Sequence, residues 1–266
     1  MSVASHMPLV SLIVVTYQSA TLMPAFFEVL AQTRYPNYEV LVVDNASGDG
    51  IAEVVARLRP ETRVICNRQN VGFGRACNQG AQAAQGDVLV FLNADVLTTP
   101  DWLDNLVAQP DVAVLCPTTL YPGQTRPKPM AAFAESAAVP GCAMVMPRWA
   151  WQALGGFDER IFLYWEDTEL CWRAWLHGWR VLVDLEAEVY HERGGSGGGQ
   201  RWDAEQMKNG IYTHLKLLRW RMVVPFLLSS AVKTVAKRVL RGQHGLHESW
   251  CWNWRHLGVT LSQRRA

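Results

Sequence analysis

The sequence predicts an α/β protein with a mostly parallel central sheet flanked by helices. Three observations lead to this prediction: apolar runs of strand length recur along the chain, helix-like segments separate most of them, and polar loops follow the first two. Alternating strands and helices are typical of parallel sheets that are covered on both faces. With 266 residues, of which 49% are hydrophobic, the chain is long enough to bury a full core.

Five apolar runs are the expected strands of this sheet: residues 9–15, 38–43, 63–66, 88–92 and 112–116. The loops after the first two, TYQSA and DNASGDG, are polar. Their side chains should therefore lie at the carboxyl ends of the strands, where open α/β sheets bind ligands.

Beyond residue 139 the pattern becomes mixed. AVPGCAMVMPR predicts a strand, RWAWQAL a short helix, and EDTELCWRAWLHG a helix that ends at Gly178. In that helix Trp172, Trp175 and Trp179 recur at helical spacing, which favours packing in the core. The glycine run at 194–199 has no packing side chains, and we expect a mobile loop and a candidate lid there.

The last part of the chain predicts two amphipathic helices, the second beginning at Pro225. Residues 205–266 hold 11 Lys or Arg against two acids, whereas the preceding residues have a net charge of −8. The basic stripe of the second helix lies opposite an apolar one: Lys233, Lys237 and Arg241 against Leu228, Val232, Val235 and Val239. Two alternatives stay open, namely a helical appendage packed on the sheet or an interfacial segment on anionic lipid.

The cysteines and the apolar runs indicate the compartment. Six scattered cysteines without a CxxC pair are typical of reduced thiols in a cytosolic protein. No signal-peptide pattern opens the chain, and residues 1–6 look like a cloning remnant. The apolar run at 222–232 has 11 residues, whereas a membrane span needs about 20. We expect a cytoplasmic protein, with peripheral association at the inner face of the cytoplasmic membrane as an open alternative.

Two carboxylates should emerge at one edge of the sheet. Asp44 and Asn45 follow the second expected strand, and Asp95 follows the fourth. Carboxylates at such an edge suit a nucleotide with Mg²⁺ or Mn²⁺, although each acid alone also fits a turn or a helix cap. The segment NVGFGRACNQG precedes a helix and could face a diphosphate, but it matches neither common phosphate-binding motif.

A second acidic pair, Glu166 and Asp167, opens the helix of EDTELCWRAWLHG. The helix dipole should keep both carboxylates ionised, and an ionised carboxylate can accept a proton from an attacking hydroxyl. Plain helix-start charge explains the pair equally well. His191 could be an imidazole ligand of the same ion, although a lone histidine is more often structural.

Four blocks in this order, VSLIVVTYQSA, VLVVDNASGDG, NVGFGRACNQGAQAAQGDVLVFLNADV and GGFDERIFLYWEDTELCWRAWLHGWRV, resemble the family 2 inverting glycosyltransferases with the GT-A fold. The resemblance is strongest to their rhamnosyltransferase-like branch and covers residues 8–220. It implies a catalytic domain at 8–204, with a donor half at 8–116 and an acceptor half at 117–204, followed by the basic helical tail at 205–266. It also implies a nucleotide-sugar donor and a divalent metal, Mg²⁺ or Mn²⁺.

The resemblance also implies a role for each matching residue. Asp167 resembles the general base and is paired with Glu166, and His191 matches a metal-contacting position. Asn93, Ala94 and Asp95 stand at the family's Asp-x-Asp metal motif; because Asn93 replaces the first Asp, Asp95 must supply the main carboxylate. The donor site would comprise Thr16, Tyr17, Asp44, Asn45, Asn70, Gly72, Arg75 and Asn78. A motif after the catalytic domain is matched by Asn209, Tyr212 and Lys216.

The implied reaction moves a sugar, with inversion, to a hydroxyl of a saccharide or a polyprenyl-diphosphate-linked saccharide in cell-envelope polysaccharide synthesis. L-rhamnose from dTDP-rhamnose is the preferred donor, and a UDP sugar is the alternative. A sugar-phosphate nucleotidyltransferase would need a basic loop, which TYQSATLMP lacks. A non-catalytic nucleotide-sugar-binding module recruited to membranes is a further alternative. We expect no nucleic-acid partner.

Overall fold

The computed structural model describes residues 7–107, 109, 111–126, 131–192, 200–241 and 246–264. These residues form two compact units. One comprises the described residues up to 162 together with 166–192, and the other comprises 163–165 with the described residues from 200 onward. The candidate lid at 194–199 and the opening residues 1–6 lie outside the described residues.

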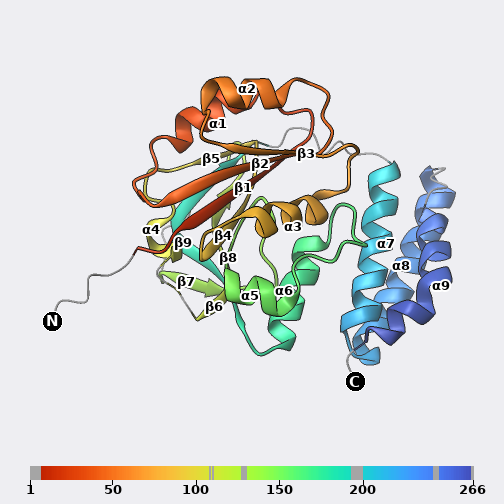
Figure 1. Ribbon diagram of the computed structural model, residues 1–266. Helices are drawn as coiled ribbons and strands as arrows, with labels where there is room; N and C mark the ends of the chain where they lie inside the picture. The colour runs from red at the N-terminus through yellow and green to blue at the C-terminus, as the bar shows by residue number, and fades with distance from the viewer. Residues whose placement is uncertain are drawn as a thin grey trace. The chain divides into compact units, whose positions relative to one another are not determined.

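Nine strands of the described residues form one sheet: β1 (Val10–Thr16), β2 (Tyr38–Asp44), β3 (Arg63–Cys66), β4 (Val88–Asn93), β5 (Val96–Thr98), β6 (Val112–Leu120), β7 (Phe133–Glu135), β8 (Ala143–Pro147) and β9 (Arg180–His191). Their order is β3-β2-β1-β4-β8-β6-β9-β5, and β7 pairs with β9 (Figure 1). The neighbours from β3 to β4 are parallel, whereas β8 runs antiparallel to β4 and β6. The predicted α/β sheet is confirmed, and it is a mixed sheet.

Helices cover both faces of the sheet (Figure 1). They are α1 (Met23–Leu30), α2 (Ile51–Leu58), α3 (Phe73–Ala83), α4 (Asp104–Val107), α5 (Arg148–Leu154) and α6 (Glu166–Leu176). Alternate residues of β1 show the two faces: Leu12 packs in the core under α1 and α2, and Ile13 packs in the core under α3, α5 and α6. This period of two is what a strand buried on both faces requires.

The expectation that the three tryptophans near α6 pack in the core holds in part: Trp179 packs against the core cluster, whereas Trp175 is exposed. Trp175 is 41% exposed, while Trp172 and Trp179 are half-buried. The helix buries Leu170, Cys171 and Ala174 against the sheet instead. A stripe of smaller side chains lets the helix approach the strands, and the indole rings are left at its edge; the Trp175 indole N–H donates to the Ser136 carbonyl at 2.9 Å.

The second unit is a bundle of three helices, where we expected two: α7 (Gln200–Leu217), α8 (Trp220–Arg241) and α9 (Leu246–Ser262). Ile211, Leu215 and Val223 form its buried centre. The expected helix start at Pro225 is wrong, because α8 begins at Trp220 and includes the proline. Pro225 is the sixth residue of α8, so it removes the hydrogen bond to the carbonyl of residue 221 and its ring crowds that carbonyl. None of the described helices combines the length and the hydrophobicity needed to cross a bilayer.

Candidate active site

Polar residues of three adjacent strands meet at one edge of the sheet. The strand register pairs Thr16 with Asp44 on β2 and Val15 with Asn93 on β4. Thr16 is buried and its hydroxyl donates to the Val43 carbonyl at 3.3 Å, so this hydroxyl is used within the sheet. The next residue, Tyr17, is 50% exposed, and its ring is free to lie against a base or a sugar.

Hydrogen bonds join the loops that follow β1 and β2. The Ser47 hydroxyl accepts the Gln18 N–H at 2.9 Å, and the Asp49 carboxylate accepts the Ala20 N–H at 2.8 Å. Asp44 Oδ1 accepts the Ser47 N–H at 3.0 Å, which fixes the turn that follows β2. These hydrogen bonds therefore hold the two loops together beside the strand ends.

Asn45 holds the segment before α3. It is 3% exposed; its amide donates to Asn70 Oδ1 at 2.9 Å and to the Gly72 carbonyl at 3.2 Å, and its oxygen accepts the Val71 N–H at 2.9 Å. Gly72 has φ +90°, and a Cβ there would lie 2.4 Å from the Phe162 carbonyl oxygen. Only glycine fits this position, and the backbone at 70–72 is fixed at the start of α3.

Asn78 and Arg75 on α3 face different surroundings. Asn78 is buried; its amide donates to the Phe157 carbonyl and its oxygen accepts the Phe157 N–H, both at 2.9 Å. These bonds attach α3 to the loop before α6. Arg75 pairs with Glu159 at 3.3 Å, and about half of each side chain is exposed. An exposed pair of this kind is weak, so the guanidinium can turn to an anion near the start of α3.

Asp95 and His191 lie side by side. The antiparallel pairing of β5 with β9 sets Val96 opposite His191, and Asp95 directly precedes Val96. The distance between Asp95 Oδ1 and His191 Nε2 is 3.2 Å. Both side chains are largely buried, as is Ala94. The Asp95 contact, followed by that of Cys142, raises the pKa of His191 to about 10.

Asp95 and His191 are suited to bind a divalent ion that also binds the diphosphate of a nucleotide. Their Oδ1 and Nε2 atoms are close enough for one ion to contact both once the imidazole has lost its proton. Mg²⁺ sites typically take one or two protein carboxylates and complete their shell with phosphate oxygens and water. Among the described residues no group of three or more His, Cys, Asp or Glu side chains is placed to hold a metal by itself. A substrate would have to complete the shell.

The turn at Gly141 and Cys142 connects the two acidic parts of the site, and the sequence analysis did not identify it. The Cys142 carbonyl accepts the Asn93 N–H at 3.0 Å, and the Gly141 N–H donates to Asp167 Oδ2 at 3.0 Å. A Cβ at Gly141 would lie 3.4 Å from the Asp167 Cβ. The only sequence signal was the Pro-Gly pair before β8, which is typical of a turn. His191, which pairs with Asp95, contacts Cys142, and Asp167 contacts Gly141, so the two acidic parts of the site border one turn.

Glu166 and Asp167 differ although they are adjacent. Burial, and after it the neighbouring Asp167 charge, raises the pKa of Glu166 to about 8, and its Oε2 has no hydrogen-bond partner among the described residues. Burial also raises the pKa of Asp167, but this carboxylate accepts the N–H groups of Gly141 and Thr168. The expectation of two ionised carboxylates is wrong for Glu166, because burial outweighs the helix dipole. At neutral pH Glu166 is protonated.

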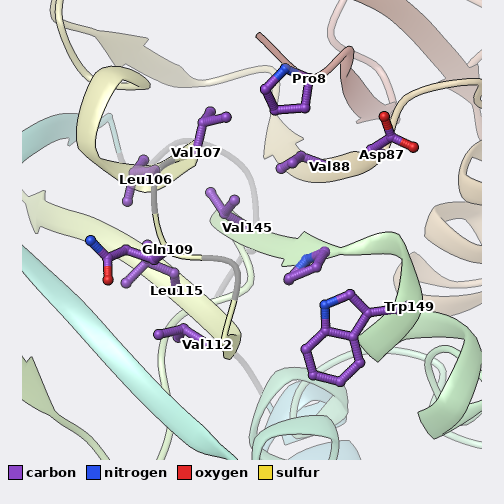
Figure 2. A pocket seen from close by; sticks show the side chains of 11 residues that line it. Pro8, Asp87, Val88, Leu106, Val107, Gln109, Val112, Leu115, Val145 and Trp149 are labelled. Carbon is purple, nitrogen blue, oxygen red and sulfur yellow. The ribbon is translucent and has the colours of Figure 1, made fainter. Parts of the chain in front are cut away.

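A cavity of about 200 Å³ lies at the opposite edge of the sheet, where β1, β4 and β6 begin (Figure 2). Its lining is mainly aliphatic and includes Pro8, Val88, Leu106, Val112, Val145 and Trp149. It shares no residue with the strand-end site. Because carboxyl strand ends, not amino ends, form the ligand-binding edge of such sheets, we do not assign a donor to this cavity.

Comparison with known families identifies the chain. The model of Glycosyl transferase family 2 matches residues 11–160. The protein belongs to glycosyl transferase family 2. The matched residues include the three strand ends and the start of α3, whereas Glu166, Asp167 and His191 lie beyond them.

Curated family members are similar over much of this chain. O-antigen biosynthesis protein RfbC of Myxococcus xanthus is 28% identical over 63% of this chain and 16% of its own length. N-acetylglucosaminyl-diphospho-decaprenol L-rhamnosyltransferase of Mycobacterium tuberculosis is 25% identical over 70% of this chain and 76% of its own length. Putative glycosyltransferase EpsH of Bacillus subtilis is 31% identical over 38% and 30%. The chain thus spans less than a third of two of these relatives.

Solved structures share the fold. GalNAc-T7 with UDP, GalNAc and Mn²⁺ has a TM-score of 0.68 at 17% identity, over 80% of this chain and 48% of the other. Mannosyltransferase PcManGT of Pyrobaculum calidifontis, in complex with GDP-Man and Mn²⁺, has a TM-score of 0.64 at 21% identity, over 79% and 64%. These likenesses establish the GT-A-like fold of this family member.

The three residues of the tail motif lie in the helical unit. Tyr212 is buried and its hydroxyl donates to Gln263 at 3.2 Å, and Lys216 Nζ lies 5.7 Å from the centre of the Tyr212 ring. These two residues make contacts within the bundle. Asn209 contacts the segment that precedes Glu166 in the sequence.

Proposed function

We propose that this family 2 glycosyltransferase moves a sugar from a nucleoside diphosphate to an acceptor hydroxyl, with inversion and with help from a divalent ion. The observation that carries the proposal is the turn at Gly141 and Cys142, which borders the Asp95–His191 pair as well as Asp167. Asp167 would activate the acceptor hydroxyl, and the Asp95–His191 pair would hold the leaving diphosphate. The turn places both in one site under this proposal.

The donor would lie along the strand ends. Tyr17 would contact the nucleoside, and Asp44 would accept a hydrogen bond from the base or the ribose. Asn45, Asn70 and Asn78 would act mainly by fixing the backbone, because their amides bond to neighbouring protein groups. Gly72, which lets the Phe162 backbone approach closely, would fix the start of α3 where the helix N-terminus can face the diphosphate.

The leaving group would be held at the other end of the donor. Asp95 and His191 would hold Mg²⁺ or Mn²⁺, with Asn93 beside them, and a bound ion neutralises charge on a departing diphosphate. Arg75 would add its own charge, since its pairing with Glu159 is exposed and weak.

Asp167 would be the general base. Its two backbone hydrogen bonds hold the carboxylate in place, and its raised pKa makes it a better proton acceptor than a fully solvated aspartate. Glu166, protonated at neutral pH, leaves Asp167 as the ionised member of the pair. Removing the hydroxyl proton opposite the leaving diphosphate gives inversion.

The relatives support a finer assignment of substrates. The mycobacterial relative is named as an L-rhamnosyltransferase that acts on a decaprenol-linked sugar, and the Myxococcus protein is named for O-antigen biosynthesis. We infer L-rhamnose from dTDP-rhamnose as the donor, a UDP sugar as the alternative, and a polyprenyl-diphosphate-linked saccharide of the cell envelope as the acceptor.

An enzyme with a lipid-linked acceptor needs a surface that binds membranes, and α8 has a suitable one. Val224, Leu228, Val232 and Val235 share one face of this helix and are between 49% and 68% exposed. Arg221 beside them and Lys233 on the other side of the helix are also exposed. An apolar face with basic neighbours suits the interface of an anionic bilayer, so we infer peripheral attachment through α8.

Replacing the general base tests the reaction. Asp167→Asn should lower kcat for transfer by about 10²-fold or more, the scale of a general base, while nucleotide affinity stays within about twofold. Steady-state transfer assays and calorimetric titration measure the two quantities. Asp101→Asn, at an exposed turn, is the matched control. Near-normal turnover of Asp167→Asn would remove Asp167 from the mechanism.

Product analysis separates the remaining alternatives. A glycosyltransferase releases a nucleoside diphosphate, whereas a sugar-phosphate nucleotidyltransferase forms pyrophosphate. A binding module would form neither product from a nucleotide sugar.

A further inference from the structure

The two residues before Glu166 have an unusual backbone. Tyr164 has φ +66° and Trp165 has φ +76°, and no other consecutive non-glycine pair in the described ranges lies in the left-handed region. A Cβ disfavours this conformation, so two such residues in succession persist only where their surroundings hold them. The segment Leu163–Trp165 belongs by its contacts to the helical unit.

Asn209 on α7 holds this segment. It is 1% exposed, and its side-chain amide donates to the Leu163 carbonyl at 2.9 Å and to the Tyr164 carbonyl at 3.1 Å. Both hydrogens of the amide are therefore used by two successive carbonyls of the strained segment. Removing the amide would leave these carbonyls without the groups that orient them.

The Trp165 ring is seated beside Asn209. A Cβ at Gly210 would lie 3.0 Å from Trp165 Cζ2, so the ring packs directly on the glycine backbone of α7. His214 on α7 and Phe226 on α8 lie edge-on to the ring, at centroid distances of 5.4 and 6.4 Å. The backbone and the side chain of the segment are both fixed by the helical unit.

The ends of the segment lead to the candidate active site. Phe162, just before it, accepts the Phe73 N–H at 2.9 Å at the start of α3. Trp165, at its other end, is joined by one peptide bond to Glu166, the first residue of α6. A change in the backbone at 164–165 therefore changes the direction in which α6 starts, and with it the position of Asp167.

We propose that Asn209 is a positioning residue for transfer, which holds the strained segment Leu163–Trp165 so that Asp167 is presented at the start of α6. This role rests on the proposed function, since it supports the group that we assign as the general base. It also gives the helical unit a part in the reaction besides any contact with a membrane.

Two buried asparagines of the helical unit allow a matched test. Asn253 on α9 is 3% exposed, and its amide likewise donates to two carbonyls, those of Lys208 and Ser249, both at 2.9 Å. Asn209→Ala and Asn253→Ala each remove one buried amide and two such bonds. Only the first removes bonds to the segment before Glu166.

The activity comparison uses kcat against donor KM. Asn209→Ala should lower kcat by about 10-fold or more with donor KM within about twofold, because a small displacement of a reacting group is costly. Asn253→Ala should change neither by more than about twofold. Equal losses of kcat in both variants, or normal kcat in Asn209→Ala, would overturn the proposal.

Hydrogen exchange gives a readout that does not depend on activity. Amides of residues 163–168 should exchange about 10-fold faster or more in Asn209→Ala than in the wild type, and at the wild-type rate in Asn253→Ala. Unchanged exchange in Asn209→Ala would overturn the positioning role. If the wild type transferred no sugar, the proposed function would be wrong. The hydrogen-exchange comparison would still test whether Asn209 holds the segment. Should Asn209→Ala not fold, Gly210→Ala, which displaces Trp165, takes its place.

Discussion

At the scale of single residues, two adjacent carboxyl groups have different surroundings. Glu166 packs against α3: a Cβ added at Gly74 would lie 3.6 Å from the Cβ of Glu166. Burial raises the pKa of Glu166 to about 8. Asp167 lies at the turn at Gly141 and receives N–H donors. Backbone hydrogen bonds therefore stabilise the ionised form of Asp167, whereas Glu166 Oε2 has no such partner among the described residues.

The stability of the protein should reflect this protonated glutamic acid. The unfolded chain loses the Glu166 proton near pH 4.5, whereas the folded chain keeps it until about pH 8. Between these values the unfolded state binds fewer protons, so this residue lowers the free energy of unfolding as pH rises, by about 1 kcal/mol per pH unit.

Glu166→Gln removes this titration. The stability of the variant relative to the wild type should therefore increase as pH rises from 5 to 7.5, which urea unfolding at several pH values measures. A difference that does not change with pH would show that Glu166 is ionised in the folded protein.

The sequence indicated candidate residues at the strand ends but not what surrounds them. Asp44 and Asp95 could be placed at the sheet edge because each follows an apolar run. The turn at Gly141 and Cys142 could not be assigned to the site, because its bonds reach Asn93 and Asp167, which are distant in the chain. The neutral state of Glu166 was missed for the same reason, since its burial depends on α3.

At the scale of elements, the strand ends carry the residues proposed to hold the donor and the metal, and the segments between the strands fix the backbone around them. Two such segments approach closely at Gly72. Gly72→Ala would add the cost of a positive φ to a clash at 2.4 Å with the Phe162 carbonyl oxygen. Gly123→Ala, at φ +81°, would add only the first cost, because nothing lies within 4 Å of its Cβ.

We predict that Gly72→Ala lowers the free energy of unfolding by at least about 2 kcal/mol, and Gly123→Ala by about 1 kcal/mol. Gly72→Ala should also weaken nucleotide binding, whereas Gly123→Ala should not. Denaturant unfolding and calorimetry provide both numbers. Equal losses in the two variants would mean that the segment at 70–72 moves aside without cost.

Strands with continuous apolar runs were predictable, and the others were not. The five strands expected from apolar runs are present within a few residues of their expected ends, and the strand expected in AVPGCAMVMPR is present as β8. No strand was assigned to 180–191, although the alternation of apolar and polar residues in β9 is itself typical of a half-buried strand. Strands β5 and β7 have three residues each, which is too short for a periodic pattern to appear. Their positions depend on pairing with β9, a contact between distant segments.

At the scale of the whole molecule, one unit carries the candidate site and the other carries the basic helices. The exposed apolar face of α8 should bind vesicles that contain anionic lipid. Leu228→Asp should lower co-sedimentation with such vesicles by about fivefold or more, since it puts a negative charge on this face. Leu58→Asp on α2, also at an exposed leucine, is the control.

Salt should weaken the same binding, because the basic residues contribute through charge. If Leu228→Asp bound as the wild type does, the membrane surface would have to lie on another part of the chain.

The direct test of the central claim is calorimetric titration of UDP, dTDP and GDP, with and without Mn²⁺, into the wild type and Asp95→Ala. The account predicts that one nucleotide binds at least about 10-fold more tightly with Mn²⁺ and that Asp95→Ala abolishes this difference. Binding that ignores the metal, or a metal effect that persists in Asp95→Ala, would contradict the assignment of the strand-end site.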